Sequence, residues 1–131
     1  MINYGFSLWL VPQPSYNINT SHIPHITLAT CFYDGPPQVQ CTRNKRYRVK
    51  FFEGISQFPN NMYDKESPEG SIGIYCKIDN MELDHEPHMT LSYDKDVNVS
   101  NIKIPEFAFC DLYLVDTRDS NPYNWKLLKK Y

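Results

Sequence analysis

The chain has little of what would place it in several large protein classes. No apolar run approaches the ~18 residues that a membrane-spanning helix needs, so no membrane partner is expected. Lys and Arg number 13 against 15 Asp and Glu, and the net charge of -2 excludes a surface that coats nucleic acid broadly, though not a local basic groove. Little alanine and ten prolines argue against long helices.

The cysteines lack the spacing of a metal or redox motif. The four cysteines show no C-x-x-C spacing, and no basic and then apolar leader precedes the first strand-like run. We therefore expect free thiols in a reducing compartment and a cytoplasmic protein. The length suits one domain, so we expect residues 1–131 to form a single unit that buries about two-thirds of its unfolded surface.

What the chain has instead is a series of short β-branched and aromatic runs separated by turn residues. This pattern predicts about seven strands, arranged as two antiparallel sheets or one curled sheet over a shared core. No convincing amphipathic helix is present. The expected strands span residues 4–11, 25–33, 45–53, 71–78, 88–93 and 107–116, and residues 124–131 form either a last strand or a short terminal helix.

Histidine is rare, and its placement is the most informative feature of the sequence. All four histidines lie in two copies of one phrase, H-x-P-H-x-T-L, at residues 22–28 and 85–91. The copies are 63 positions apart in the 131-residue chain, one in each half. Such a repeat predicts an internal duplication that produces two pseudo-symmetric lobes, each with one His-x-Thr unit.

Strand geometry gives each copy a polar face. Residues i and i+2 of a strand project to the same side, so His25 points with Thr27, and His88 points with Thr90. The intervening apolar residues point the other way, into the core. If the two strands meet, two imidazoles and two hydroxyls converge on one site.

Such a set suits cleavage of a phosphodiester. Histidine titrates near neutral pH, so one ring can act as general base while the other acts as general acid. The base would deprotonate a water or a ribose hydroxyl, and the acid would protonate the leaving oxygen. Threonine hydroxyls would donate hydrogen bonds to the non-bridging oxygens as negative charge develops. We predict catalytic roles for His25, Thr27, His88 and Thr90, with no cofactor.

A metal site is the sharper alternative, because H-x-x-H pairs can supply zinc ligands. Two features weigh against it. Pro24 and Pro87 prevent the helix that would bring residues i and i+3 together, and in a strand these residues face opposite sides. We therefore expect no metal, and the outer histidines, His22 and His85, are interpreted as rim or capping residues.

Several other residues are candidates for substrate binding. Trp9 could stack on a base or belong to the core. Arg46 and Arg48 lie on one face of an alternating strand, either as a solvated edge or as a wall that steers phosphate. Ser92 shares the face of the second motif and could line the cleft. Tyr93 follows the motif, although strict alternation favours a core position.

The two motifs resemble those of the 2H phosphoesterases, a group that includes RNA 2',3'-cyclic phosphodiesterases and 2',5'-RNA-ligase-like proteins. "PHITL" and "PHMTLSY" match the paired motifs with their preceding proline, and the opening "YGFSLWLVP" is similar to the first strand of the cyclic phosphodiesterase branch. The closing residues 112–117 and then Trp125 are similar to its last strand and aromatic return.

The resemblance implies a strand-dominated α+β fold, with duplicated bilobal antiparallel sheets around a central cleft. It also implies metal-independent action on nucleotides and places the catalytic positions on both His-x-Thr pairs. Only about a dozen residues separate Pro12 from His25, too few for the helix that family members usually place there. We therefore expect reduced helices, as in compact viral and phage proteins of this kind, and by analogy a location in the host cytoplasm.

The expected function is hydrolysis of a 2'-linked or cyclic phosphodiester in a small nucleotide. The substrate would be a 2',3'-cyclic nucleotide, a 2',5'-oligoadenylate or a cyclic di- or oligonucleotide messenger, and a viral antagonist of nucleotide-based immune signalling would have this activity. A non-catalytic nucleotide-binding module and an RNA end-processing cyclic phosphodiesterase are the alternatives. The implied partner is a small nucleotide or short oligonucleotide, with no membrane and no protein partner.

Overall fold

A computed structural model describes residues 4–18, 20, 23–38, 46–52, 54–58, 71–92 and 99–131. Within these ranges the regular elements are strands apart from three short 3-10 helices, and no α-helix is present. No helix there is long and apolar enough to cross a membrane. The elements are β1 (Phe6–Pro12), η1 (Pro14–Tyr16), β2 (His25–Phe32), β3 (Tyr47–Phe51), β4 (Ser56–Phe58), β5 (Ser71–Ile78), β6 (His88–Ser92), η2 (Val99–Asn101), β7 (Phe107–Asp116), η3 (Pro122–Asn124) and β8 (Lys126–Lys130).

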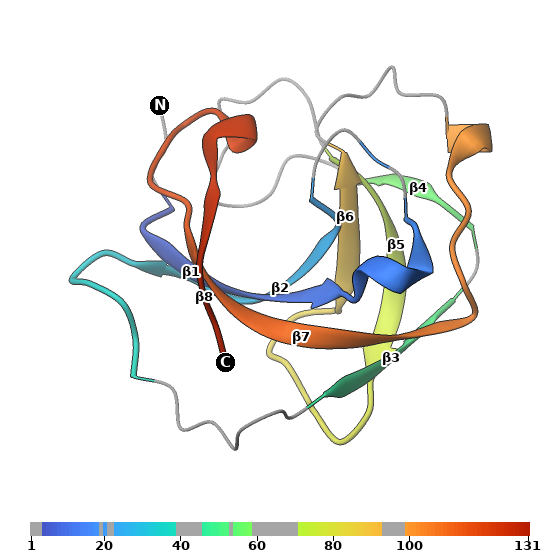
Figure 1. The fold of residues 1–131 in the computed structure, drawn as a ribbon, viewed down its shortest axis with the longest axis horizontal. Helices are drawn as coiled ribbons and strands as arrows, with labels where there is room; N and C mark the ends of the chain where they lie inside the picture. Colours follow the sequence, from blue (N-terminus) through green and yellow to red (C-terminus); the bar gives the residue numbers. More distant parts are fainter. Residues whose placement is uncertain are drawn as a thin grey trace.

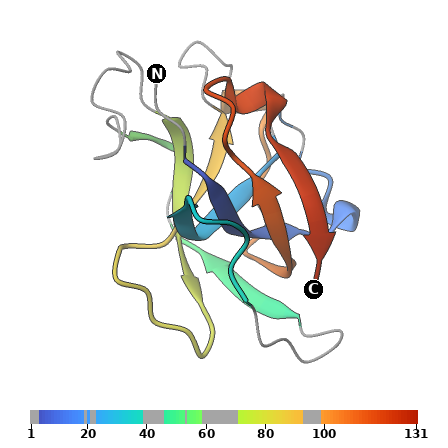
Figure 2. The ribbon, with the colours of Figure 1, turned by 90° about the vertical axis from the view of Figure 1, so that its left-hand side faces the viewer.

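Six of the strands close into an antiparallel barrel. The order is β1-β2-β6-β5-β3-β7, and a further pairing of β1 with β7 completes the ring. Figure 1 shows these strands wrapping around a common centre, and Figure 2 shows the same ring turned by 90°. β8 adds to the outer side of β7, and β4 pairs with β5. Closure gives each barrel strand a neighbour on both sides, although β2 and β6 pair over only two residues.

This architecture corrects one expectation from the sequence. The described residues give no evidence for duplicated bilobal sheets around a central cleft, because strands of the two halves are interleaved in one sheet. β2 of the first half pairs with β6 of the second, and β1 and β3 both pair with β7. The expectation of a strand-dominated antiparallel fold with few helices is confirmed.

The barrel interior holds the hydrophobic core. Alternate residues of each strand point inward, as the period of two requires. Full burial of a side chain of this size contributes about 1.5–3 kcal/mol relative to exposure. The buried core residues include Leu10 of β1, Ile26 of β2, Val49 of β3, Ile74 and Ile78 of β5, Met89 and Leu91 of β6, and Ala108 and Leu112 of β7. The residues that alternate with these therefore lie on the outer face of the barrel.

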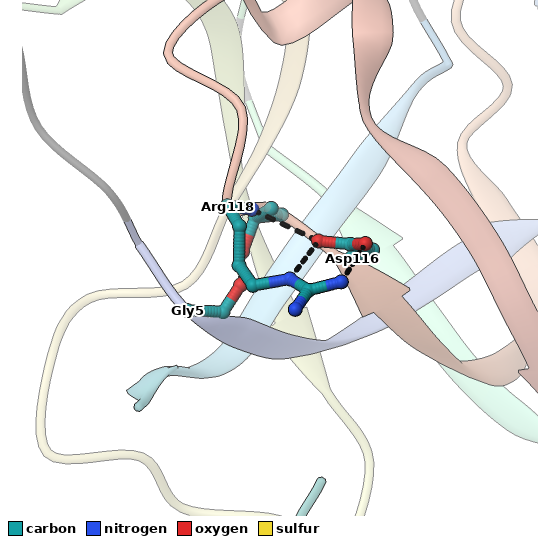
Figure 3. A network of polar contacts seen from close by, with 4 residues as sticks. Gly5, Asp116 and Arg118 are labelled. Atoms are coloured by element: carbon teal, nitrogen blue, oxygen red, sulfur yellow. Dashed lines mark hydrogen bonds and ion pairs between the residues drawn. The ribbon is translucent and has the colours of Figure 1, made fainter. Parts of the chain in front are cut away.

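A compact polar network fastens the start of the chain to the end of β7 (Figure 3). The backbone N–H and hydroxyl of Thr117 both donate to the carbonyl of Gly5, at 3.0 and 2.8 Å. Gly5 has φ = 62°, and a Cβ there would lie 2.8 Å from the carbonyl oxygen of Phe32, so no other residue fits without strain. Beside it, Arg118 donates two side-chain hydrogen bonds to the Asp116 carboxylate.

The strand predictions agree closely with the structure. The expected runs 71–78 and 107–116 coincide with β5 and β7. The terminal segment, expected to be a strand or a short helix, is a strand at residues 126–130. The short strand β4 was not predicted, because its three residues lack a long apolar alternation. Cys31, Cys76 and Cys110 are free thiols, as expected, whereas Cys41 lies outside the described residues.

Candidate active site

The two copies of the histidine motif lie side by side. β2 and β6 pair in antiparallel orientation, which places His25 opposite Thr90 and Ile26 opposite Met89. Ile26 and Met89 are fully buried in the barrel core. Because side chains alternate, the histidine and the threonine of this cross-strand pair project from the outer face of the wall. Motif copies 63 positions apart in the sequence thus place a histidine and a threonine side by side on one face of the wall, where both are buried.

Thr27 and His88 follow directly on the paired residues, and we call the four motif residues the histidine square. One further step of the same register would place Thr27 opposite His88, so that each histidine would face the threonine of the other copy. Cβ atoms directly opposite each other in an antiparallel pair are about 4.5–5.5 Å apart, and diagonal neighbours about 7–8 Å. The two histidines occupy one diagonal. This separation allows two rings to flank a phosphate with the two hydroxyls beside it.

Both motif histidines are held by the same local hydrogen bond. Nδ1 of His25 donates to the carbonyl of Ile23 at 2.7 Å, and Nδ1 of His88 donates to the carbonyl of Glu86 at 3.3 Å. A carbonyl can only accept, so the proton of each neutral ring lies on Nδ1 and the lone pair on Nε2. The proline between donor and acceptor favours an extended backbone at the preceding residue, which directs its carbonyl towards the ring.

The first histidine is deeply covered. His25 has an exposed fraction of 0%, and its ring stacks on Trp9 of β1 with centroids 3.6 Å apart and planes 8° apart. Trp9 is 2% exposed and makes an edge contact with Trp125, whose ring lies 5.7 Å away. Thr90, opposite His25, is 4% exposed. Trp9 thus covers one face of the His25 ring, and Trp125 packs against Trp9.

The second histidine is only half-buried. Burial lowers the pKa of His88 below its usual 6.5, and the neighbouring His85 charge lowers it further, while the hydrogen bond to the Glu86 carbonyl and the Glu86 charge act in the opposite direction. The neutral ring is therefore favoured at physiological pH. A neutral imidazole with its lone pair on Nε2 is suited to accept a proton.

Strand β5 contributes residues that the motif search did not identify. Tyr75 lies opposite His88 and is 37% exposed, and Gly73 lies opposite Thr90, where it adds no side chain. Lys77 follows on the same face and is exposed. The alternation of residues 71–78 could have shown that Gly73, Tyr75 and Lys77 share one face of a strand. Only the pairing of β5 with β6 shows that this face lies beside His88 and Thr90.

Of the two outer histidines, His85 belongs to the described residues. His22 lies outside the described residues. His85 is exposed, and its Nε2 donates to the backbone carbonyl of Thr27 at 3.1 Å, across from one motif copy to the other. Its Nδ1 contacts the Asp84 carboxylate at 2.9 Å. In the part of the chain that the structure describes, no three His, Cys, Asp or Glu side chains cluster as metal ligands would.

The other predicted binding residues are not gathered at the square. Arg48 pairs with Asp79 at 3.4 Å on β3, which β5 separates from β6, and Arg46 is exposed just before β3. Ser92 is on β6 but fully buried. Tyr93 lies outside the described residues. Substrate contacts by these four residues and by the buried Trp9 stay predictions.

Two hollows formed by described residues lie elsewhere. One of about 450 Å³ is lined by Phe51, Ile74 and Ile102 of the core, with Glu106 at its edge. Another of about 540 Å³ lies beside Arg118 and Lys126. Neither includes a residue of the two motifs. The histidine square is thus a face of the barrel wall, and its recognition properties depend on the side chains around it.

Comparison with known proteins yields no match. No protein-family model matches the chain, and no curated protein or solved structure matches it. The resemblance to the 2H phosphoesterases therefore stays a prediction based on the two motifs. The functional argument depends on the geometry of the site itself.

Proposed function

We propose that the protein is a metal-independent phosphodiesterase that hydrolyses a 2'-linked or cyclic phosphodiester of a small nucleotide. One observation carries the proposal: antiparallel pairing of β2 with β6 places His25 opposite Thr90, and both motif histidines have Nδ1 held by a backbone carbonyl. Two imidazoles with the same tautomer on one face are the minimum that acid–base cleavage needs. Two threonines on the same face supply hydrogen-bond donors for the phosphoryl oxygens.

The two rings differ in a way that assigns their roles. His88 has a lowered pKa, so its Nε2 accepts the proton of a water or a ribose hydroxyl as that oxygen attacks phosphorus. His25 stacks on Trp9, and the face of an indole ring attracts a cation. Full burial of His25 opposes a cation, so the stacked indole and the approaching phosphate would have to stabilise the protonated ring that donates its Nε2 proton to the leaving oxygen as the phosphorus–oxygen bond breaks. Proton transfer through solvent then restores both rings.

The burial of His25 sets a condition on this reaction. With an exposed fraction of 0%, this ring contacts substrate only when the side chains that cover it, Trp9 among them, shift. The same burial favours a second candidate function, a nucleotide-binding module in which His25 is structural and only the half-buried His88 meets the ligand. Such a module would sequester a signalling nucleotide without cleaving it, and either activity would serve an antagonist of nucleotide signalling.

A chromatographic screen separates these functions. Wild-type protein is incubated in chelator with 2',3'-cyclic nucleotides, ADP-ribose cyclic phosphate, 2',5'-oligoadenylate and cyclic di- and trinucleotides. The matched variant is His88→Asn, because the asparagine amide can still donate to the Glu86 carbonyl but cannot transfer a proton. We expect cleavage of one substrate class by the wild type, and a loss of about 10²–10⁴-fold in the variant.

Three outcomes would contradict the enzyme proposal. Activity that chelator abolishes would indicate a metal mechanism, and a fully active His88→Asn variant would remove the acid–base role. Tight binding of a panel member by calorimetry, with the ligand recovered intact, would establish the binding module instead. The exposed Glu82, which lies in the loop before the second motif, provides the surface control Glu82→Gln, which should match wild type in every assay.

A further inference from the structure

The loop that leads into β6 is fastened to the strand of the other motif through one side chain. His85 lies three residues before His88, and its ring reaches β2, where Nε2 donates to the carbonyl of Thr27 at 3.1 Å. The pairing of β2 with β6 ends at Ile26 and Met89. The His85 ring therefore continues the connection between the two segments at the point where Thr27 and His88 would be the next pair.

The other nitrogen of the same ring contacts a carboxylate. Nδ1 of His85 lies 2.9 Å from Oδ1 of Asp84, and the charge and hydrogen bond of His85 hold the pKa of Asp84 below its usual value. Both partners of the ring are acceptors, so both hydrogen bonds form together when each ring nitrogen carries a proton. The positive charge of that ring also acts on His88, since it contributes to the lowered pKa there.

We propose that His85 is a positioning residue, which ties the loop before His88 to the backbone of Thr27 and so fixes the spacing of the two motif copies. The inference depends on the proposed phosphodiesterase function for its kinetic consequences. His85 precedes β6, so the alternation of side chains along that strand suggests no role for it. A displacement of about 1 Å in a catalytic group costs on the order of a hundredfold in rate, so a fastening at this point matters for catalysis.

Two substitutions separate positioning from simple support of the fold. In His85→Gln the amide nitrogen can still donate to the Thr27 carbonyl, whereas His85→Ala removes the hydrogen bond. We expect kcat to fall roughly a hundredfold in His85→Ala with a smaller change in KM, and most of the loss to be recovered in His85→Gln. Both variants remove the charge, so the titration midpoint of His88, followed by NMR of its ring, should rise in both.

The contact between His85 and Thr27 can be tested even if the proposed function is wrong. If the wild type cleaves no member of the panel, the carbonyl ¹³C shift of Thr27 still tests the contact: it should move in His85→Ala and stay near the wild-type value in His85→Gln. An unchanged shift and unchanged kcat in His85→Ala would overturn the proposal. Equal losses of kcat in both variants, in parallel with a lower melting temperature, would also overturn it, because they would show support of the fold alone. Glu82→Gln is again the control in the same loop.

Discussion

The two copies of H-x-P-H-x-T-L share a sequence and a hydrogen bond, yet they occupy different environments. His25 has no exposed surface, whereas His88 is half-buried. The difference comes from the neighbouring strands. β1 flanks the first copy and presents Trp9, while β5 flanks the second copy and presents Gly73 and Tyr75. A repeated motif thus acquires distinct chemistry from the strands on either side of it.

This asymmetry fits a division of labour between the rings. A general acid must hold a proton until the leaving oxygen takes it, and a general base must be neutral when the reaction begins. Burial favours the neutral form of His88, whereas at His25 the stacked indole favours a cation and the deeper burial opposes it. If the copies were equivalent, the two rings would have the same proton affinity and either could take either role.

The largest expected effect comes from substituting each histidine in turn. The amide nitrogen of an asparagine at either position can replace Nδ1 as the donor to the backbone carbonyl two residues before it. An asparagine cannot, however, transfer a proton. We expect His25→Asn and His88→Asn each to lower kcat about 10²–10⁴-fold. Only His25→Asn should also lower stability, by about 1–3 kcal/mol, since its ring is buried against Trp9.

Kinetics and denaturant melts on the two asparagine variants check this contrast. Equal stability losses would show that the two environments are energetically alike, and the comparison between the copies would fail. Retained activity in His25→Asn alone would favour the binding module, in which the first histidine is structural.

A second contrast concerns the aromatic neighbours of the two copies. Trp9→Ala removes a ring that is 2% exposed and should cost about 3–5 kcal/mol of unfolding free energy. Tyr75→Ala removes a ring that is 37% exposed and should change stability by about 0.5 kcal/mol or less. Urea unfolding followed by circular dichroism measures both. A small effect of Trp9→Ala would mean that the cover over His25 is loosely packed.

Tyr75 also allows the two motif copies to be compared by their contribution to substrate binding. It is the aromatic side chain directly opposite His88 on the more open half of the face, and an exposed ring there can stack on a nucleobase. Loss of such stacking costs about 1–3 kcal/mol per base, so KM should rise in Tyr75→Ala and stay near wild type in Tyr75→Phe. Steady-state kinetics with the cleaved nucleotide tests this, and an unchanged KM in Tyr75→Ala would place the base elsewhere.

The sequence predicted the local structure well and the global arrangement poorly. Alternation of apolar residues is a local property, so the bounds of the runs 71–78 and 107–116 could be predicted. The shared face of His25 and Thr27 stays a prediction. Which strands become neighbours depends on long-range pairing. The interleaving of β2 with β6 and the closure of β1 on β7 left no signal in a single sequence.

The candidate site shows the same limit. The repeated phrase identified both histidine–threonine pairs, because motif identity needs no knowledge of neighbours. The stacking of Trp9 on His25 and the contact of His85 with the Thr27 carbonyl were missed, since each joins residues that are distant in the chain. Periodicity shows the face on which a side chain lies, whereas the residue it contacts is decided by register between strands.

The smallest expected effect is a shift in the titration of His88. Burial lowers its folded pKa below 6.5, so between the folded and unfolded pKa values the unfolded chain binds more protons. Stability should therefore rise with pH across that window: the contribution is present above about 6.5 and is lost as pH falls through the folded pKa. In His88→Asn this part of the pH dependence should disappear. Ring signals followed by NMR, with melts at matched pH, measure both quantities. A midpoint at or above 6.5 would remove the basis for naming His88 the base, and the two copies would then have to exchange roles.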